Sequence, residues 1–154
     1  MGGRGGPRRE SELVFCGGKW HPFPGTNTML KTFLSVLFVG CGSFLGGAAR
    51  YLVSKALPAG SGAGFPWATF SVNVAGCFLL GLIAGFAGRA GGMDQRLRLL
   101  LATGFCGGFT TFSTFMDENA ALLRSGHVFV FILYLSVSFV FGFAAILIGY
   151  QLTK

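Results

Sequence analysis

Four long apolar runs dominate the chain, and short polar stretches separate them. The runs cover residues 32–53, 67–87, 97–123 and 128–152. Each is long enough to cross the membrane, because a helix needs about 20 residues to span about 30 Å of hydrocarbon. Backbone groups in lipid must find their hydrogen-bond partners within the segment. We therefore expect an all-α integral membrane protein with four transmembrane helices.

Residues 1–28 break this pattern, since they are rich in Gly, Pro and Arg and show no helical period. They also lack the apolar core and the small-residue cleavage site of a secretory signal. Two interpretations stand: a disordered N-terminal extension, or a start codon assigned upstream of a native start at Met29. In either case we expect the working domain to span residues 29–154.

The composition agrees with a membrane protein. The chain of 154 residues is 52% hydrophobic and only 11% charged, whereas soluble domains carry roughly 25% charged residues. Its net charge of +7 is scattered between the apolar runs, and this distribution argues against nucleic-acid binding. Three of the four cysteines lie inside apolar runs and none forms a CxxC pair, so we expect neither a zinc site nor a disulfide framework.

Glycines recur at helical spacing within the apolar runs. Small residues four apart let two helices approach closely in lipid, so these pairs predict tight helix packing. The three pairs are Gly42/Gly46, Gly81/Gly85 and Gly104/Gly108.

The third run is polar in its middle, where residues 104–115 read GFCGGFTTFSTF. Gly destabilises helix interiors, and Ser and Thr bond back to backbone carbonyls. We therefore expect a helix break near residues 107–110. Carbonyl oxygens freed at membrane depth can coordinate a small hard cation. The alternative is a Gly-rich packing seam in which every hydroxyl is hydrogen-bonded.

Two phenylalanines and an asparagine accompany this stretch. Phe112 and Phe115 share a helix face, and the positive edges of their rings suit an anion. Their alternative role is lipid or core packing. Asn73 in the second run offers two amide donors, either to an anion or to a neighbouring helix. Thr69 lies one turn earlier on the same face.

Three further groups of polar residues have two interpretations each. Arg50 either snorkels to the membrane interface or attracts anions in a vestibule. Glu118 either pairs with a basic residue or ends a chain of hydrogen bonds. Tyr134, Ser138 and Gly142 form one stripe of the fourth run, here called the polar stripe, which is a polar track or a close-packing seam.

Three segments together resemble one family. GGAARY at 46–51, TFSVNVAG at 69–76 and GFCGGFTTFSTFMDE at 104–118 are similar to the Fluc (CrcB) fluoride channels, and the likeness runs in order over residues 29–154. The resemblance implies a fluoride-selective channel for passive fluoride efflux, not an enzyme, in the inner (plasma) membrane. It also implies an antiparallel, dual-topology homodimer, or a dimer with a homologous second copy. Such a dimer has two pores and a central structural sodium ion.

The resemblance also assigns roles to individual residues. Arg50 matches a vestibule arginine, and Glu118 the acidic residue after the Phe pair. Backbone carbonyls of Gly107 and Thr110 match the sodium ligands. Gly142 departs from the family, because some members have serine there. The implied fluoride-pore residues are Thr69, Asn73, Phe112, Ser113, Thr114, Phe115, Tyr134 and Ser138.

The charge distribution bears on insertion. Over residues 29–154 five Lys and Arg lie on the N-terminal side and three on the other, a weak bias that permits both orientations. Counting residues 1–28 raises the ratio to nine against three, which favours one orientation. An antiparallel dimer of one chain needs both, so we expect Met29 to be the native start or residues 1–28 to be neutral to insertion.

Two other function classes remain as alternatives. A small dual-topology multidrug/proton antiporter needs a carboxylate in its first helix, but the only charge within that run is Arg50. A non-conducting membrane assembly protein explains the glycine pairs but not the polar residues. For an enzyme, the sequence offers no plausible nucleophile–base pair.

Overall fold

The computed structural model describes residues 13–16, 19–22, 26–57, 64–89 and 92–154. The chain divides into two units, Met1–Leu34 and Ser35–Lys154. All of the residues with a proposed function belong to the second unit.

A two-stranded antiparallel hairpin lies in the first unit. Strand β1 (Leu13–Cys16) pairs with β2 (Lys19–Pro22), with Val14 opposite His21 and Phe15 opposite Trp20. The all-α prediction is therefore wrong for these residues, whose β-branched and aromatic side chains favour strands. The predicted extension at 1–28 otherwise lies largely outside the described residues.

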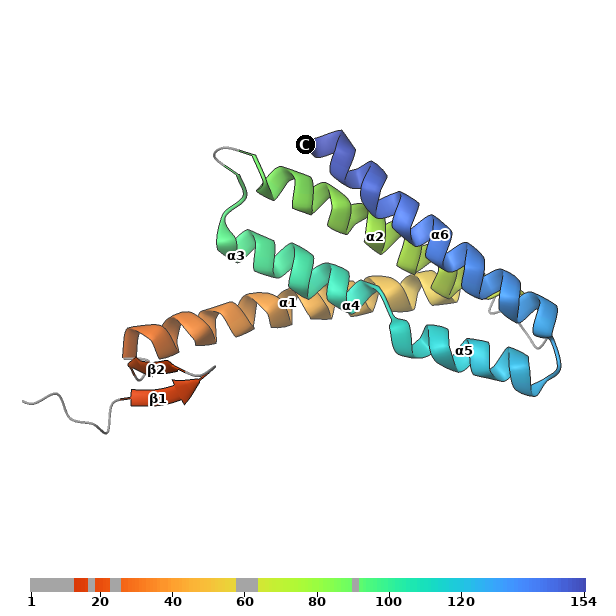
Figure 1. Cartoon of the computed structure of the whole chain (residues 1–154), viewed down its shortest axis with the longest axis horizontal. Helices are drawn as coiled ribbons and strands as arrows, with labels where there is room; N and C mark the ends of the chain where they lie inside the picture. The colour runs from red at the N-terminus through yellow and green to blue at the C-terminus, as the bar shows by residue number, and fades with distance from the viewer. Residues whose placement is uncertain (1–12, 17–18, 23–25, 58–63, 90–91) are drawn as a thin grey trace, which may run out of the picture. The chain divides into compact units, whose positions relative to one another are not determined.

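Every other regular element is helical in the described part of the chain (Figure 1). Four stretches are long and apolar enough to cross a membrane, namely Thr28–Ala56, Trp67–Ala87, Gln95–Arg124 and Val128–Thr153. The predicted fold of four transmembrane helices is thus confirmed, and the chain is a multi-pass membrane protein. The elements are α1 (Thr26–Ala56), α2 (Trp67–Ala87), α3 (Gln95–Arg98), η2 (Leu99–Cys106), α4 (Gly107–Phe109), α5 (Phe112–Arg124) and α6 (Val128–Thr153).

The third stretch changes its winding twice. Its η2 portion is a π-helix, a rare form that is found frequently at functional sites. The path then leaves helical geometry at Thr110 (φ −77°, ψ 157°) and Thr111 (φ −147°, ψ 118°). Gly107 remains helical, with φ −64° and ψ −36°. The sequence predicts a break near residues 107–110. The observed extended pair begins at Thr110, the last residue of that region, and ends one residue beyond it at Thr111.

Glycines bring α1 against the third stretch. A Cβ at Gly42 would overlap the carbonyl oxygen of Leu100, and a Cβ at Gly46 would overlap that of Phe105. From the opposite side, a Cβ at Gly108 would meet the Ser43 backbone. Two of the predicted glycine pairs, Gly42/Gly46 and Gly104/Gly108, thus belong to one interface in which backbones touch.

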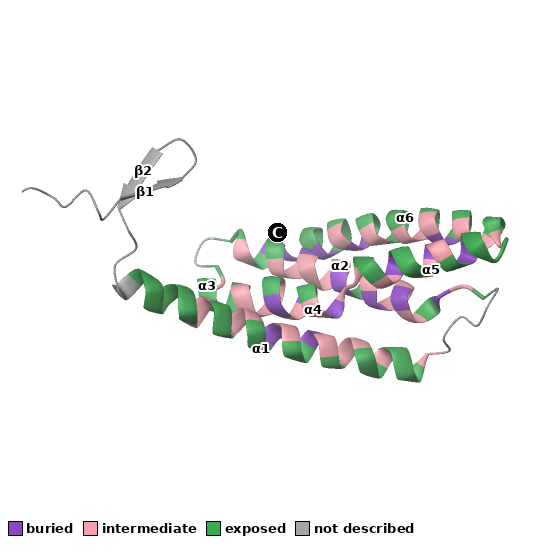
Figure 2. Ribbon diagram, turned by 90° about the horizontal axis from the view of Figure 1, so that it is seen from below, coloured by how far each residue is buried: buried purple, intermediate pink, exposed green. Residues whose placement is uncertain are grey.

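The third glycine pair serves a second interface. Helices α2 and α6 run side by side (Figures 1 and 2). A Cβ at Gly81 would overlap the Ile146 carbonyl oxygen, and one at Gly149 would overlap that of Phe78. The Thr153 hydroxyl donates to the Leu82 carbonyl at 3.0 Å, which joins the C-terminal ends of these helices.

Few large side chains are buried in the single chain. Phe115, Leu122 and Tyr134 form the core between α5 and α6, and Tyr134 is fully buried. Figure 2 shows exposed residues along the outer faces of α1 and α6. These faces carry large apolar side chains such as Phe44 and Phe129, so they suit lipid or another subunit.

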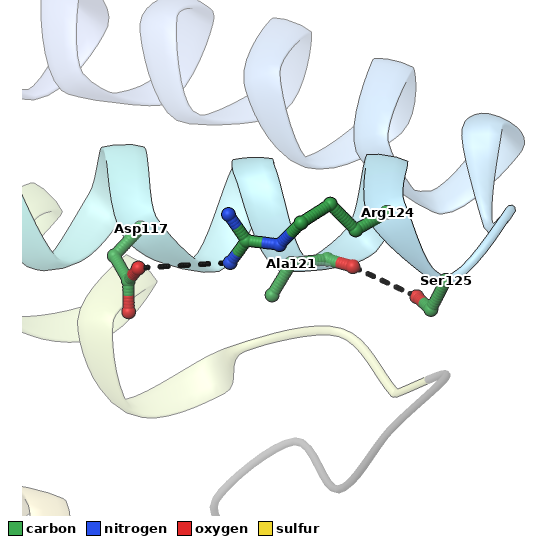
Figure 3. A network of polar contacts seen from close by, with 4 residues as sticks. All are labelled: Asp117, Ala121, Arg124 and Ser125. Atoms are coloured by element: carbon green, nitrogen blue, oxygen red, sulfur yellow. Dashed lines mark hydrogen bonds and ion pairs between the residues drawn. The ribbon is translucent and has the colours of Figure 1, made fainter.

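A tight turn joins α5 to α6. The Ser125 hydroxyl donates to the Ala121 carbonyl at 2.9 Å, and Arg124 lies 3.9 Å from Asp117 (Figure 3). Both charged side chains are mostly exposed, so this ion pair contributes little to stability. Gly126 follows with φ +78°, a left-handed conformation that glycine adopts without strain.

Candidate functional site

Asn73 on α2 binds the extended backbone between α4 and α5. Its Oδ1 accepts from the Thr111 N–H at 2.8 Å, and its Nδ2 donates to the Thr111 carbonyl at 3.1 Å. One side chain thus pairs both backbone groups of a residue that has left the helix. Buried backbone groups without partners are costly, so Asn73 stabilises the extended conformation. Its amide keeps a second N–H for another acceptor.

The Thr111 side chain caps the N-terminus of α5. Its Oγ1 accepts from the Thr114 backbone N–H at 3.3 Å and lies 3.0 Å from Thr114 Oγ1. Ser113 Oγ is 3.4 Å away, and Ser113 is exposed. A threonine cap satisfies one of the free donors of the first turn. The structure therefore makes Thr111 central to this region, although the sequence analysis did not single it out.

Glu118 accepts hydrogen bonds from two hydroxyl groups on different helices. Thr69 Oγ1 on α2 donates to Oε1 at 2.7 Å, and Tyr134 OH on α6 donates to Oε2 at 2.7 Å. The sequence leaves open whether Glu118 pairs with a basic residue or belongs to a chain of hydrogen bonds, and the structure shows the chain of hydrogen bonds. It links α2, α5 and α6 through one carboxylate.

Phe112 and Phe115 differ in their surroundings. The Phe115 side chain is 5% exposed and meets the Tyr134 ring at 4.9 Å in an edge-on arrangement. Phe112 is 70% exposed in the single chain. Their ring centroids are 6.2 Å apart, so the two rings are neighbours as their spacing predicts. Phe115 therefore belongs to the core, whereas Phe112 extends from it.

A recess of about 130 Å³ lies between α2, α5 and α6. We call it the Phe recess. Ser138 Oγ beside it is buried and has no hydrogen-bond partner in the described part of the chain. A buried hydroxyl without a partner marks a place where a polar ligand or water fits. The recess is lined chiefly by Asn73, Cys77, Phe112, Phe115, Ser138 and Gly142.

A second recess of about 250 Å³ lies beside Arg50 on α1. Arg50 Nε donates to the Gly108 carbonyl at 3.3 Å, so the base of the guanidinium is fixed to α4. Thr69, Thr111 and Thr114 line the same recess. An arginine bound to the backbone in this way holds its positive charge close to the extended residues. A side chain that only snorkels to the membrane surface would have no such fixed position.

Gly107 and Thr110 line a third recess, together with Asn73. A Cβ at Gly107 would meet no described residue within 4 Å, apart from its own neighbours along the helix, so this side of α4 is open. Backbone oxygens are ligands that a hard cation prefers, and two of them make only part of a coordination shell. Within the described residues, no group of three or more His, Cys, Asp and Glu side chains is arranged to hold a metal ion. The donor set therefore fits a hard cation and needs further oxygens from elsewhere.

The structure brings part of the sequence-predicted set to the extended pair Thr110–Thr111, namely Arg50, Thr69, Asn73, Gly107, Phe112, Ser113 and Thr114. Glu118 and Tyr134 instead form a hydrogen-bonded cluster with Thr69, and Phe115 and Ser138 line the Phe recess. Besides Thr111, sequence reasoning missed Ser43, whose Oγ donates to the Gly104 carbonyl at 3.4 Å, and Cys77. The sequence signal for Thr111 is its position directly after Thr110, the last residue of the region expected to leave the helix. A thiol in an apolar run gives no such signal.

Comparison with known proteins identifies the family. The model of the family described as CrcB-like protein, Camphor Resistance (CrcB), matches residues 37–150. The chain belongs to the CrcB-like family. The resemblance noted in the three sequence segments is therefore confirmed.

Relatives within the CrcB-like family are named as fluoride-specific ion channels FluC. The protein of Chlorobium phaeobacteroides strain BS1 is 48% identical over 82% of this chain and 98% of its own length. The protein of Chlorobium luteolum is 54% identical over 75% of this chain and 89% of its own length. A third relative, from Azobacteroides pseudotrichonymphae, is 38% identical over 82% of this chain and 98% of its own length. The CrcB-like family is thus one of channels and not of enzymes, by the names of these relatives.

Proposed function

We propose that this protein is a fluoride-specific ion channel that lets fluoride leave the cell passively. The observation that carries the proposal is the Phe recess, where a pore asparagine, two phenylalanine rings and an unpartnered hydroxyl face one space. The names of the relatives agree with it.

The chemistry of the recess suits fluoride. Fluoride is small and strongly hydrated, so removing its water is costly unless other donors replace it. Asn73 retains one amide N–H, and the Ser138 hydroxyl has no partner in the part of the chain that the structure describes. The edges of the Phe112 and Phe115 rings add positive potential. Ser113 and Thr114 supply further hydroxyls along the way, so the anion meets weak donors in succession rather than one strong site. Thr69 lines the path with its oxygen and methyl group, because its hydroxyl proton is donated to Glu118.

Arg50 and Glu118 have different roles in this proposal. Arg50 raises the local concentration of anions at the pore entrance, because its charge is fixed beside the extended backbone. Glu118 orients the Thr69 and Tyr134 hydroxyls through its two hydrogen bonds. Tyr134 and Ser138 then form the polar stripe on the pore side of α6.

The working unit in this proposal is an antiparallel homodimer with two pores, or a dimer with a homologous second copy. Exposed Phe112 and the apolar faces of α1 and α6 supply the surface. Gly107 and Thr110 offer backbone oxygens for a structural sodium ion, and a second copy doubles their number. The carbonyls of Gly107 and Thr110 from both copies would hold the ion between the subunits, and the ion would supply fixed positive charge there.

Passive efflux follows from acid–base chemistry. Hydrogen fluoride crosses membranes as a neutral acid and ionises in the less acidic cytoplasm. A channel in the inner (plasma) membrane lets the resulting fluoride leave down its electrochemical gradient. The protein needs no energy source for this, and it lowers the toxic concentration of cytoplasmic fluoride.

Fluoride efflux from liposomes tests the proposal. Purified protein is reconstituted in vesicles loaded with potassium fluoride, and a fluoride electrode records efflux after valinomycin is added. We expect rapid fluoride efflux and no comparable efflux from matched chloride-loaded vesicles. Fluoride efflux no faster than in protein-free vesicles would exclude a fluoride channel. Efflux that requires a proton gradient would favour an antiporter instead.

A further inference from the structure

The polar stripe of α6 ends at Gly142, a residue without a side chain. Tyr134 donates to Glu118, and the buried Ser138 hydroxyl has no hydrogen-bond partner among the described residues. The next position along the stripe is Gly142, which contributes no donor. If an anion moves along this stripe, its last donor must come from another helix.

Cys77 on α2 lies against the vacant side of Gly142. A Cβ built on Gly142 would lie 3.6 Å from Cys77 Sγ, which is ordinary van der Waals contact. Among the described residues, and apart from the neighbours of Gly142 in the chain and the local helix backbone, no other atom comes within 4 Å of that point. The thiol therefore borders the space that a side chain at position 142 would enter.

Cys77 also shares the Phe recess with the other proposed pore residues. It follows Asn73 by one helical turn, and both line the recess together with Ser138 and Gly142. The unpartnered Ser138 hydroxyl is an independent sign that this space takes a polar ligand. A thiol is a weak hydrogen-bond donor, so it can face a desolvated anion without binding it strongly.

We infer that the Cys77 thiol completes the polar stripe and contacts fluoride in the pore, in place of a side chain at position 142. This inference rests on the proposed function, since it assigns a further residue to the same anion path. The donor that the stripe on α6 lacks at Gly142 is then supplied by Cys77 on α2. The pore of this protein then contains a thiol.

Moving the donor between the two helices tests the inference. Cys77→Ala removes the thiol, and we expect fluoride efflux to fall about three- to tenfold, as the loss of one weak donor predicts. Cys77→Ser keeps a donor and retains efflux. The double variant Cys77→Ala/Gly142→Ser returns a hydroxyl to the same space from α6, so efflux recovers. The matched control Cys77→Ala/Gly142→Ala restores volume without polarity and stays slow.

The results separate polarity from packing. Wild-type efflux in Cys77→Ala would overturn the inference, and so would equal recovery in the Ser and Ala double variants. Neither outcome bears on the fluoride channel itself, which depends on efflux by the unaltered protein. Failure of the unaltered protein to conduct fluoride would overturn the proposed function instead.

Thiol labelling gives a second measurement that needs neither flux nor a variant at position 77. In a protein with Cys16→Ala and Cys41→Ala, a small charged methanethiosulfonate reagent should modify Cys77 in the purified channel. Cys106 is 3% exposed and serves as the slow internal reference. We expect labelling to be slower in potassium fluoride than in potassium gluconate of equal concentration. Equal rates in both salts would overturn the inference.

Discussion

The Asn73 amide pairs with both backbone groups of Thr111, at 2.8 and 3.1 Å. This contact joins a side chain of one membrane helix to the only extended residues within another helical stretch of the described chain. The region that carries the proposed function is thus held by side-chain hydrogen bonds rather than by the helix ladder. Changes to those side chains should affect stability and conduction together.

Asn73→Ala should destabilise the protein and slow fluoride efflux. The substitution leaves the N–H and carbonyl of Thr111 without partners, at a cost of about 1–3 kcal/mol. For stability alone, Ser113→Ala is the matched control, because Ser113 makes only a 3.4 Å contact at the same place. Thermal unfolding in detergent, followed by gel filtration, measures the first effect and a fluoride electrode the second. Equal melting temperatures for the two variants would contradict the stabilising role of Asn73.

Glu118→Ala should destabilise the contact between α2, α5 and α6. Two buried hydroxyls lose their acceptor, and each unpaired group costs about 1–3 kcal/mol. The neighbouring substitution Asp117→Ala should change stability by no more than about 0.5 kcal/mol, because that exposed pair is weak. Unfolding of both variants in detergent compares them directly, and a larger loss in Asp117→Ala would refute this account.

Gly46→Ala should disrupt packing between α1 and the third stretch. The added methyl group overlaps the Phe105 carbonyl oxygen, and overpacking costs about 1–3 kcal/mol. Gly47→Ala meets no atom within 4 Å and should be neutral or stabilise the helix by up to about 1 kcal/mol. The opposite order of melting temperatures would show that the two helices do not approach as described.

Phe112 and Phe115 should separate conduction from folding. Phe115→Ala removes a buried core ring and should cost about 3–5 kcal/mol of stability. Phe112→Ile keeps an apolar side chain at an exposed position, so the protein should fold but lose most fluoride efflux. Parallel unfolding and efflux measurements test both. Unchanged efflux in Phe112→Ile would remove Phe112 from the proposed pore.

The sequence predicts the membrane helices because their length and apolarity are local properties. The glycine pairs are equally local, and the tight helix packing that they predict is present, with α1 against the third stretch and α2 against α6. The position of the extended residues is less predictable. Thr110 and Thr111 are identical in type, and the contact that singles out Thr111 comes from Asn73 on another helix.

Other features of the site depend on contacts between distant segments. Glu118 binds hydroxyls rather than a basic residue because Thr69 and Tyr134 are brought to it by α2 and α6. Cys77 looks like a small apolar residue in sequence, and only its contact with Gly142 gives it a role. Strands β1 and β2 were not predicted, because segments of four residues are too short to show a clear alternation of apolar and polar positions.

The interruption at Thr110 and Thr111 also divides one helical dipole into two. The stretch that ends at Phe109 presents the negative end of its dipole, and α5 presents its positive end a few residues later. Carbonyl groups therefore favour a cation on one side, while N–H groups favour an anion on the other. An unbroken helix would hold both partial charges at the membrane surfaces. Two extended residues place them next to each other in the interior, where low polarity makes each one stronger.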